Sequence, residues 1–177
     1  NLAKPGEDIV ASLCPATAHR IHMAIGISGE VGELLDCWEG VEVPDRENLV
    51  EELGDIEFYF EGLLQGYTLE QPLGMPHPEK PELGDPFLKC SILAADLLDT
   101  VKKEAIYRKD PNMDKITSLV NGFRLQLNRI YESMQVTKEE AHVHNMNKLL
   151  KGKNARYAAG SYSDQAAQDR ADKGGNL

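Results

Sequence analysis

The sequence predicts an all-α protein, a helical bundle of about five helices with a four-helix core. Apolar residues recur at the helical period in five successive segments, and no segment shows a convincing strand pattern. Aromatic residues make up only 6% of the 177 residues, whereas Leu, Ala and Glu are plentiful, which favours helix over sheet. With 41% hydrophobic residues the chain can bury one sizeable core, so we expect a single domain over 1–177.

The chain begins with an arm and two long helices. Residues 1–15 contain three helix-breaking residues, which predicts an arm with one short helical turn over 7–13. Thr17 can cap a helix that runs to Trp38, and Asp45 can cap a second that runs to Gln65. These two helices are expected to pair as one half of the core.

A segment rich in proline and glycine follows. Residues 66–86 carry five prolines and three glycines and cannot form a regular helix. A loop of this length is a lid, a subunit contact or a connector. The next helix, over 87–109, is expected to face the core with residues at helical spacing: Leu88, Ile92, Ala95, Leu98 and Val101 or Lys102.

The last part of the chain adds two more helices. Asn112 or Asp114 starts one of them, and Thr137 caps the other in a Thr-x-x-Glu box that ends at Glu140. The final helix is expected to end near Leu150. The polar tail, 158–177, includes a possible short helix from residue 163.

Two acidic pairs with the same spacing mark the first two long helices. Glu30 and Glu33 lie three residues apart, as do Glu52 and Asp55, so each pair projects from one face of its helix. Facing each other, they would form a cage of hard oxygen donors, which suits Mg2+ or Mn2+. An acidic chain also acquires such pairs by chance, so the spacing alone leaves a solvated acidic surface as the alternative.

A basic cluster follows the last helix: Lys148, Lys151, Lys153 and Arg156 stand with no acidic residue among them. Such a cluster can bind phosphate oxygens, or it can simply place cations at a helix C-terminus. No phosphate-binding loop, HExxH or nucleophile motif is present, and Glu139–His142 is one ExxH without the second that a di-iron bundle needs.

Composition limits the partners. The net charge of -10 argues against binding nucleic acid or a membrane through the whole surface. The three cysteines have neither zinc-site nor disulfide-framework spacing, and no apolar run approaches the roughly 18 residues of a membrane span. We expect a cytoplasmic protein, in a cell or an infected host.

The segments GISGEVGELLD and NLVEELGDIEFY resemble the MazG-like nucleotide pyrophosphohydrolases, an all-α superfamily whose pattern is EExxE, a spacer and ExxD. Gly29 stands at the first acidic position, so one outer carboxylate is missing. The resemblance implies that the remaining four acids hold Mg2+, or Mn2+ in its place, and that one glutamate acts as the base: Glu30, Glu33, Glu52 and Asp55.

The later segments DLLDTVKKEAIYRKD and NMNKLLKGKNARY are similar to phage and bacterial members. They imply phosphate or nucleotide contacts from Lys102, Asn147, Lys148, Lys151, Arg156 and Tyr157. Candidates for base recognition are His22, Trp38, Tyr59 and the N-terminal arm.

The activity that this resemblance implies is hydrolysis of a nucleoside triphosphate to the monophosphate and pyrophosphate, in a homodimer or homotetramer. Because the tail resembles phage members, some of which act on purine nucleotides, we expect a purine deoxynucleotide as substrate, with dGTP first. The alternatives are a dUTP or dCTP pyrophosphatase, or a noncatalytic helical interaction protein.

Overall fold

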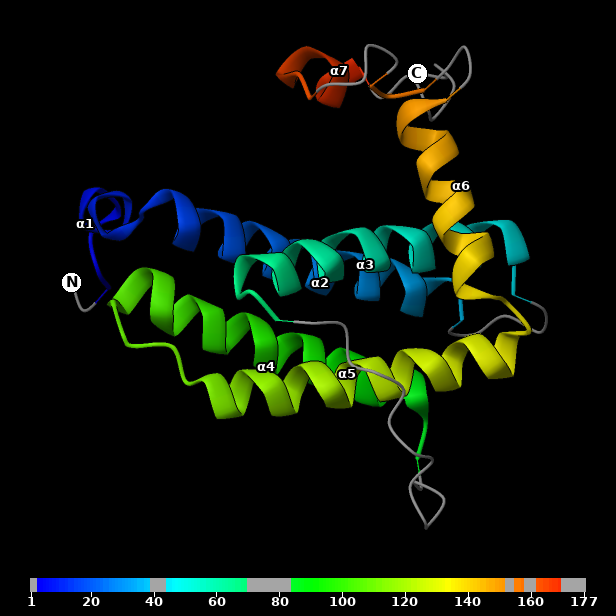
Figure 1. Cartoon of the computed structure of the whole chain (residues 1–177), viewed down its shortest axis with the longest axis horizontal. Helices are drawn as coiled ribbons and strands as arrows, with labels where there is room; N and C mark the ends of the chain where they lie inside the picture. Colours follow the sequence, from blue (N-terminus) through cyan, green and yellow to red (C-terminus); the bar gives the residue numbers. More distant parts are fainter. Residues whose placement is uncertain (1–2, 39–43, 70–83, 152–154, 158–161, 170–177) are drawn as a thin grey trace.

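The computed structural model describes residues 3–38, 44–69, 84–151, 155–157 and 162–169. All regular elements in these ranges are helices, so the predicted all-α bundle is confirmed (Figure 1). Five are long and two are short: α1 (Gly6–Ser12), α2 (Pro15–Asp36), α3 (Arg46–Gly66), α4 (Pro86–Tyr107), α5 (Met113–Met134), α6 (Lys138–Leu150) and α7 (Asp164–Asp169).

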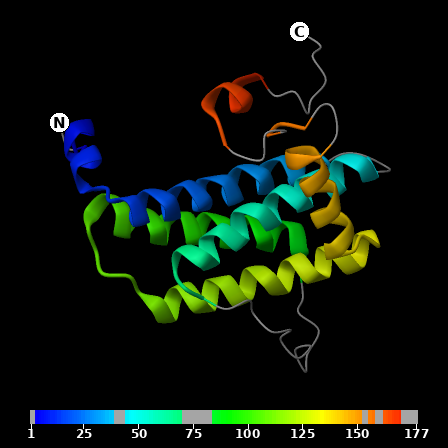
Figure 2. The same ribbon diagram turned by 45° about the horizontal axis from the view of Figure 1, so that its top comes forward.

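The four longest helices form two layers. Helices α2 and α3 run antiparallel in one layer, and α4 and α5 run antiparallel in the other, with α2 packed on α4 (Figures 1 and 2). Helix α6 crosses α3 at a steep angle near the N-terminal end of α3 (Figure 2). Helix α6 therefore leads toward the outer side of the α2–α3 layer, where α7 lies (Figure 1).

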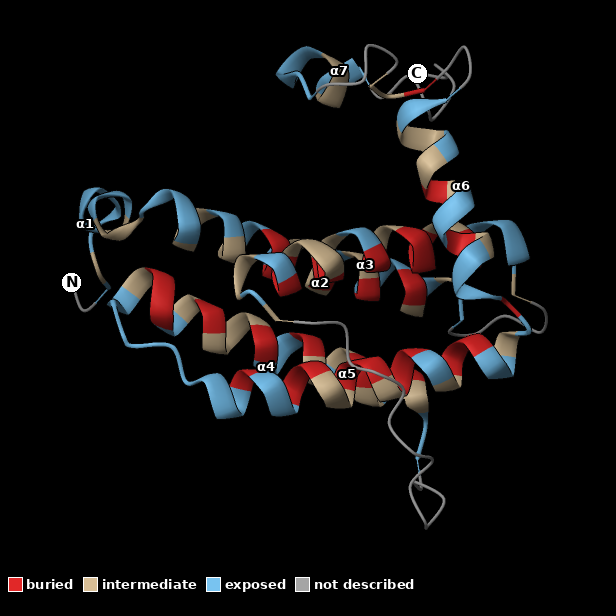
Figure 3. Ribbon diagram, viewed as in Figure 1, coloured by how far each residue is buried: buried red, intermediate tan, exposed pale blue. Residues whose placement is uncertain are grey.

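The core lies between the two layers. Figure 3 shows the buried residues on the facing sides of α2 to α5, whereas α1 and α7 have none. Phe60 of α3 and Phe123 of α5 are fully buried, with ring centroids 5.2 Å apart, and they join the layers at the centre. The outer side of the α2–α3 layer is therefore available for polar side chains.

Several helix ends agree with the predicted capping residues. Three predicted caps form: Asp45, Asn112 and Thr137. At each of them a side-chain oxygen accepts a hydrogen bond of 2.9 to 3.1 Å from the backbone N–H of a residue two or three positions later. The Thr137 box is only half formed, because the Glu140 carboxylate binds Arg46 of α3. That ion pair ties the start of α6 to the start of α3.

The predicted cap of the first long helix is wrong. Helix α2 begins at Pro15, with Cys14 as the N-cap, and Thr17 occupies the third helical position, where its hydroxyl accepts from the Cys14 N–H at 2.9 Å. Proline suits the first position because its missing N–H would have no partner there. The helix ends at Asp36, two residues before the predicted end.

The predicted core face of α4 is right at Val101, which is buried, and wrong at its first three positions, while Leu98 is partly buried. Leu88 and Ile92 are 58% and 53% exposed, and Ala95 is exposed as well. The buried face lies one residue earlier and contains Phe87, Cys90, Ala94, Leu97 and Val101. Both stripes of this helix are apolar, so periodicity could not choose between them. The aromatic ring of Phe87 takes the core side.

The predicted loop over 66–86 and tail over 158–177 lie largely outside the described residues, including 70–83 and 170–177. Whether the loop is a lid or a subunit contact therefore stays a prediction. Among the helices that are described, none combines the length and the apolar character needed to cross a membrane.

Candidate metal centre

Three of the four predicted acidic ligands meet where α2 lies against α3. One carboxylate oxygen from each of Glu30, Glu33 and Glu52 lies within 4.8 Å of the others. Glu52 is buried, with 6% exposure, whereas Glu30 is half-buried and Glu33 is exposed. The group is thus anchored on the core side by α3 and opens toward solvent along α2.

The electrostatics of this group favour a cation. Burial, then a hydrogen bond with Glu30 and the charges of the neighbouring acids, raises the pKa of Glu52 to about 8. The pKa of Glu30 is also raised, first by burial and then by the charge of Asp55. The Oε2 atom of Glu52 is buried and has no hydrogen-bond partner among the described residues. An oxygen in this position fits a divalent cation, which would supply the missing partner and the missing positive charge.

The fourth predicted ligand lies outside the group. Asp55 is held instead by α6, where the Asn145 side-chain amide donates to its Oδ1 and the Lys148 ammonium donates to its Oδ2. The same ammonium reaches Glu51 at 3.3 Å. The i,i+3 spacing on α3 correctly placed Asp55 beside Glu52. However, both carboxylate oxygens of Asp55 accept hydrogen bonds from side chains of α6.

Helices α2 and α3 approach closely beside the acidic group. A Cβ atom on Gly26 would lie 2.3 Å from the Tyr59 ring, so only glycine fits there. A Cβ on Gly29 would meet nothing within 4 Å, so close packing does not explain that glycine. Burial and then the charges of Glu30 and Asp55 raise the pKa of Tyr59.

The predicted basic residues are only partly brought to the site. The chain turns back after α6, where the Arg156 N–H donates to the Lys148 carbonyl at 3.0 Å, and the charge of Arg156 lowers the pKa of Tyr59. Tyr157 follows, with its ring 5.7 Å from that of Tyr162. Lys148 thus contacts Asp55 directly, whereas Arg156 and Tyr157 act on Tyr59 through their charges.

Other predicted contacts lie elsewhere. Lys102 pairs with Asp99 on α4 at 2.7 Å rather than with the acidic group. Trp38 stacks on Phe87, with centroids 4.8 Å apart, and does not face the acids. Asn147 and Lys151 are exposed on α6 and its C-terminal end.

Sequence reasoning missed Asn145, which is 4% exposed and contacts Asp55. Its signal was the i,i+3 spacing to Lys148, which places both residues on the face of α6 that meets α3. The candidate for base recognition His22 is exposed but lies edge-on to Tyr59, with ring centroids 6.0 Å apart. It therefore borders the site.

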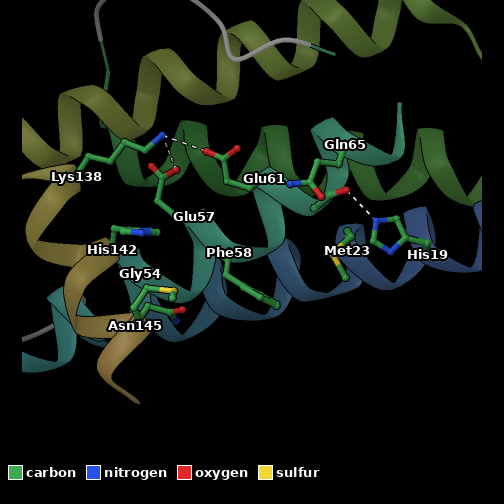
Figure 4. A pocket seen from close by; sticks show the side chains of 12 residues that line it. His19, Met23, Gly54, Glu57, Phe58, Glu61, Gln65, Lys138, His142 and Asn145 are labelled. Atoms are coloured by element: carbon green, nitrogen blue, oxygen red, sulfur yellow. Dashed lines mark hydrogen bonds and ion pairs between the residues drawn. The ribbon is translucent and has the colours of Figure 1, made fainter. Parts of the chain in front are cut away.

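A groove of about 400 Å3 opens on the outer face of α3 between α2 and α6 (Figure 4). Its walls include Met23 and Met146, and the ring of Phe58, which is half exposed. Asn145 lines the groove and also donates to Asp55, so this residue connects the groove to Asp55.

The polar groups of the groove lie at its ends. Lys138 bridges Glu57 and Glu61, at 3.2 and 3.3 Å, and His19 bonds the Gly62 carbonyl at 2.9 Å (Figure 4). An apolar middle with polar ends suits a small planar ligand.

In comparisons with protein-family models, curated proteins and solved structures, nothing matches this chain.

Proposed function

We propose that this chain is a MazG-like nucleoside triphosphate pyrophosphohydrolase that depends on Mg2+ or Mn2+. The observation that carries the proposal is the convergence of Glu30, Glu33 and Glu52, with one buried oxygen of Glu52 lacking a partner. A merely solvated acidic surface would leave its carboxylates in water with ordinary pKa values, whereas burial raises the pKa of Glu52 to about 8.

The proposed residues divide the chemistry between the pair of helices α2 and α3 and the end of α6. When bound, a divalent cation would neutralise phosphate oxygens and polarise a water molecule. Glu30, Glu33 and Glu52 would hold it, and one of these glutamates would accept the proton of the attacking water. Lys148 and Arg156 would bind the departing pyrophosphate through charge-assisted hydrogen bonds. Water adds to the α-phosphorus, the bond to the bridging oxygen breaks, and the monophosphate and pyrophosphate leave.

We further assign the nucleoside to the groove. Phe58 is one helical turn from Asp55 on α3, and its half-exposed ring offers a stacking surface for a base. Trp38, the earlier candidate, stacks on Phe87 instead. The similarity of the later segments to phage members supports dGTP or GTP as the first substrates to test.

The test is hydrolysis of all eight common NTPs and dNTPs with Mg2+ or Mn2+, with pyrophosphate and phosphate measured separately. We expect pyrophosphate from one or two purine nucleotides, and Glu52→Gln should abolish it. The matched control is Glu47→Gln, which alters an exposed glutamate in the first turn of the same helix. Full activity of Glu52→Gln, or no hydrolysis of any nucleotide by folded protein, would refute the proposal. The second outcome would favour a noncatalytic interaction protein.

The groove assignment has its own test. Phe58→Ala should raise the KM for the preferred nucleotide by about tenfold and change kcat little, because a stacking contact acts on the ground state and the transition state alike. Tyr107→Ala is the control, since Tyr107 is an equally exposed aromatic residue on α4. An unchanged KM for Phe58→Ala would place the base elsewhere.

A further inference from the structure

Lys148 is a buried cation among carboxylates. Its side chain is only 7% exposed, and its ammonium contacts both Glu51 and Asp55, which lie one turn apart on α3. Its charge also lowers the pKa of Glu30, so it acts on the acidic group beyond its direct partners. Lys148 is thus the positive charge that balances this side of the site in the absence of a metal ion.

The position of Lys148 conflicts with its proposed role toward phosphate. The ammonium sits between Asp55 and Glu51 with only 7% of the side chain exposed, which leaves a pyrophosphate little access to it, and a divalent cation beside Asp55 would repel it. Each oxygen of Asp55 accepts a hydrogen bond from α6, and this carboxylate lies outside the three-glutamate group. A cation that draws Asp55 toward the glutamates would therefore weaken its contact with Lys148.

We propose that Lys148 is an exchangeable internal counter-ion. A divalent cation bound by Glu30, Glu33 and Glu52 takes Asp55 as a further ligand and displaces the ammonium, which then becomes available to the anionic substrate. This inference rests on the proposed function, and it sets an order: cation first, polyphosphate second.

The backbone connects this exchange to a second basic residue. The carbonyl of Lys148 accepts from the Arg156 N–H at 3.0 Å, and the Leu149 carbonyl accepts from the Tyr157 N–H at 2.7 Å. These two backbone hydrogen bonds hold Arg156 and Tyr157 against the last turn of α6, next to Lys148. Asn145, one turn earlier, stays in the packed part of α6.

The first experiment is calorimetric titration of Mn2+ into the metal-free protein and two variants. Lys148→Met removes the competing charge, so we expect it to bind Mn2+ at least about fivefold more tightly than the native chain. Lys103→Met is the control, because Lys103 pairs with Asp99 on α4, and its affinity should stay native. Unchanged or weaker binding by a folded Lys148→Met variant would overturn the counter-ion inference but leave the proposed function standing. Absence of Mn2+ binding by the native chain would overturn both.

The second experiment needs no variant and decides the matter if Lys148→Met fails to fold. The rate at which acetic anhydride modifies Lys148 in the native protein is measured by mass spectrometry, with and without saturating Mn2+. We expect the buried amine to become several-fold more reactive when Mn2+ binds, while Lys103 keeps its rate. An unchanged rate at Lys148 in protein that has bound Mn2+ would show that the lysine stays on Asp55, and the inference would fail.

Discussion

The raised pKa of Glu52 makes a sharp prediction about stability and pH. The folded chain keeps this proton up to about pH 8, whereas an unfolded glutamate releases it near pH 4.5. Between these values the folded state binds more protons than the unfolded state, so the free energy of unfolding falls as pH rises and levels off above pH 8. Glu52→Gln cannot ionise and should lose this component of the pH dependence.

The size of the effect follows from the linkage relation. One pKa unit corresponds to about 1.4 kcal/mol, which sets an upper limit near 5 kcal/mol for Glu52. Because the pKa of Glu30 is also raised and the site opens to solvent along α2, we expect about 2 kcal/mol. Glu52→Gln should therefore gain about 2 kcal/mol relative to the native chain between pH 5.5 and pH 8.5.

The assay is urea unfolding in a chelating buffer, followed by far-ultraviolet circular dichroism across this pH range. Glu47→Gln serves as the control, since that side chain is exposed on the same helix. Saturating Mn2+ should reverse the trend for the native chain, because the cation favours the ionised carboxyls. Parallel pH profiles for the native chain and Glu52→Gln would refute the argument that this carboxyl is desolvated among like charges.

Three further substitutions test the packing around the site by urea unfolding. Gly29→Ala should stabilise the chain by about 0.5 to 1 kcal/mol, because the new methyl meets nothing within 4 Å and alanine favours helix. A loss of stability would show an unrecognised contact. Gly26→Ala should cost about 1 to 3 kcal/mol, since its methyl would collide with the Tyr59 ring, and a neutral effect would contradict the close approach of α2 and α3. Tyr67→Phe should cost about 1 to 2 kcal/mol by removing the 2.6 Å hydrogen bond to Glu104, and an unchanged midpoint would exclude that bond.

The helices and three of the acidic residues followed from the sequence because both depend on local spacing. Periodicity located the helices, short polar side chains marked most of their starts, and the i,i+3 pairs put Glu30 and Glu33 on one face. The spacing to Lys148 marks Asn145 on one face of α6, but its pairing with Asp55 depends on the angle at which α6 crosses α3. No local pattern encodes that angle.

The core face of α4 was mispredicted for a related reason. Leu88 and Phe87 lie on adjacent stripes that are both apolar, so the hydrophobic pattern of the helix is satisfied by either orientation. The orientation of α4 depends on how its side chains fit those of the facing layer, where the Phe87 ring stacks on Trp38. A pattern rule that ranks residues only as apolar or polar cannot detect this contact.

Repulsion within the acidic group tends to separate α2 from α3, and two buried ion pairs oppose it. Arg20 of α2 binds Glu104 of α4, and the Tyr67 hydroxyl after α3 donates to the same carboxylate at 2.6 Å. Arg124 of α5 binds Glu57 of α3 through both carboxylate oxygens. Each ion pair fixes one helix of the α2–α3 layer to the α4–α5 layer. Breaking either ion pair would leave an uncompensated buried charge. The two helices that carry the acids are thus held in register by the layer beneath, and the site can keep its like charges together before any cation arrives.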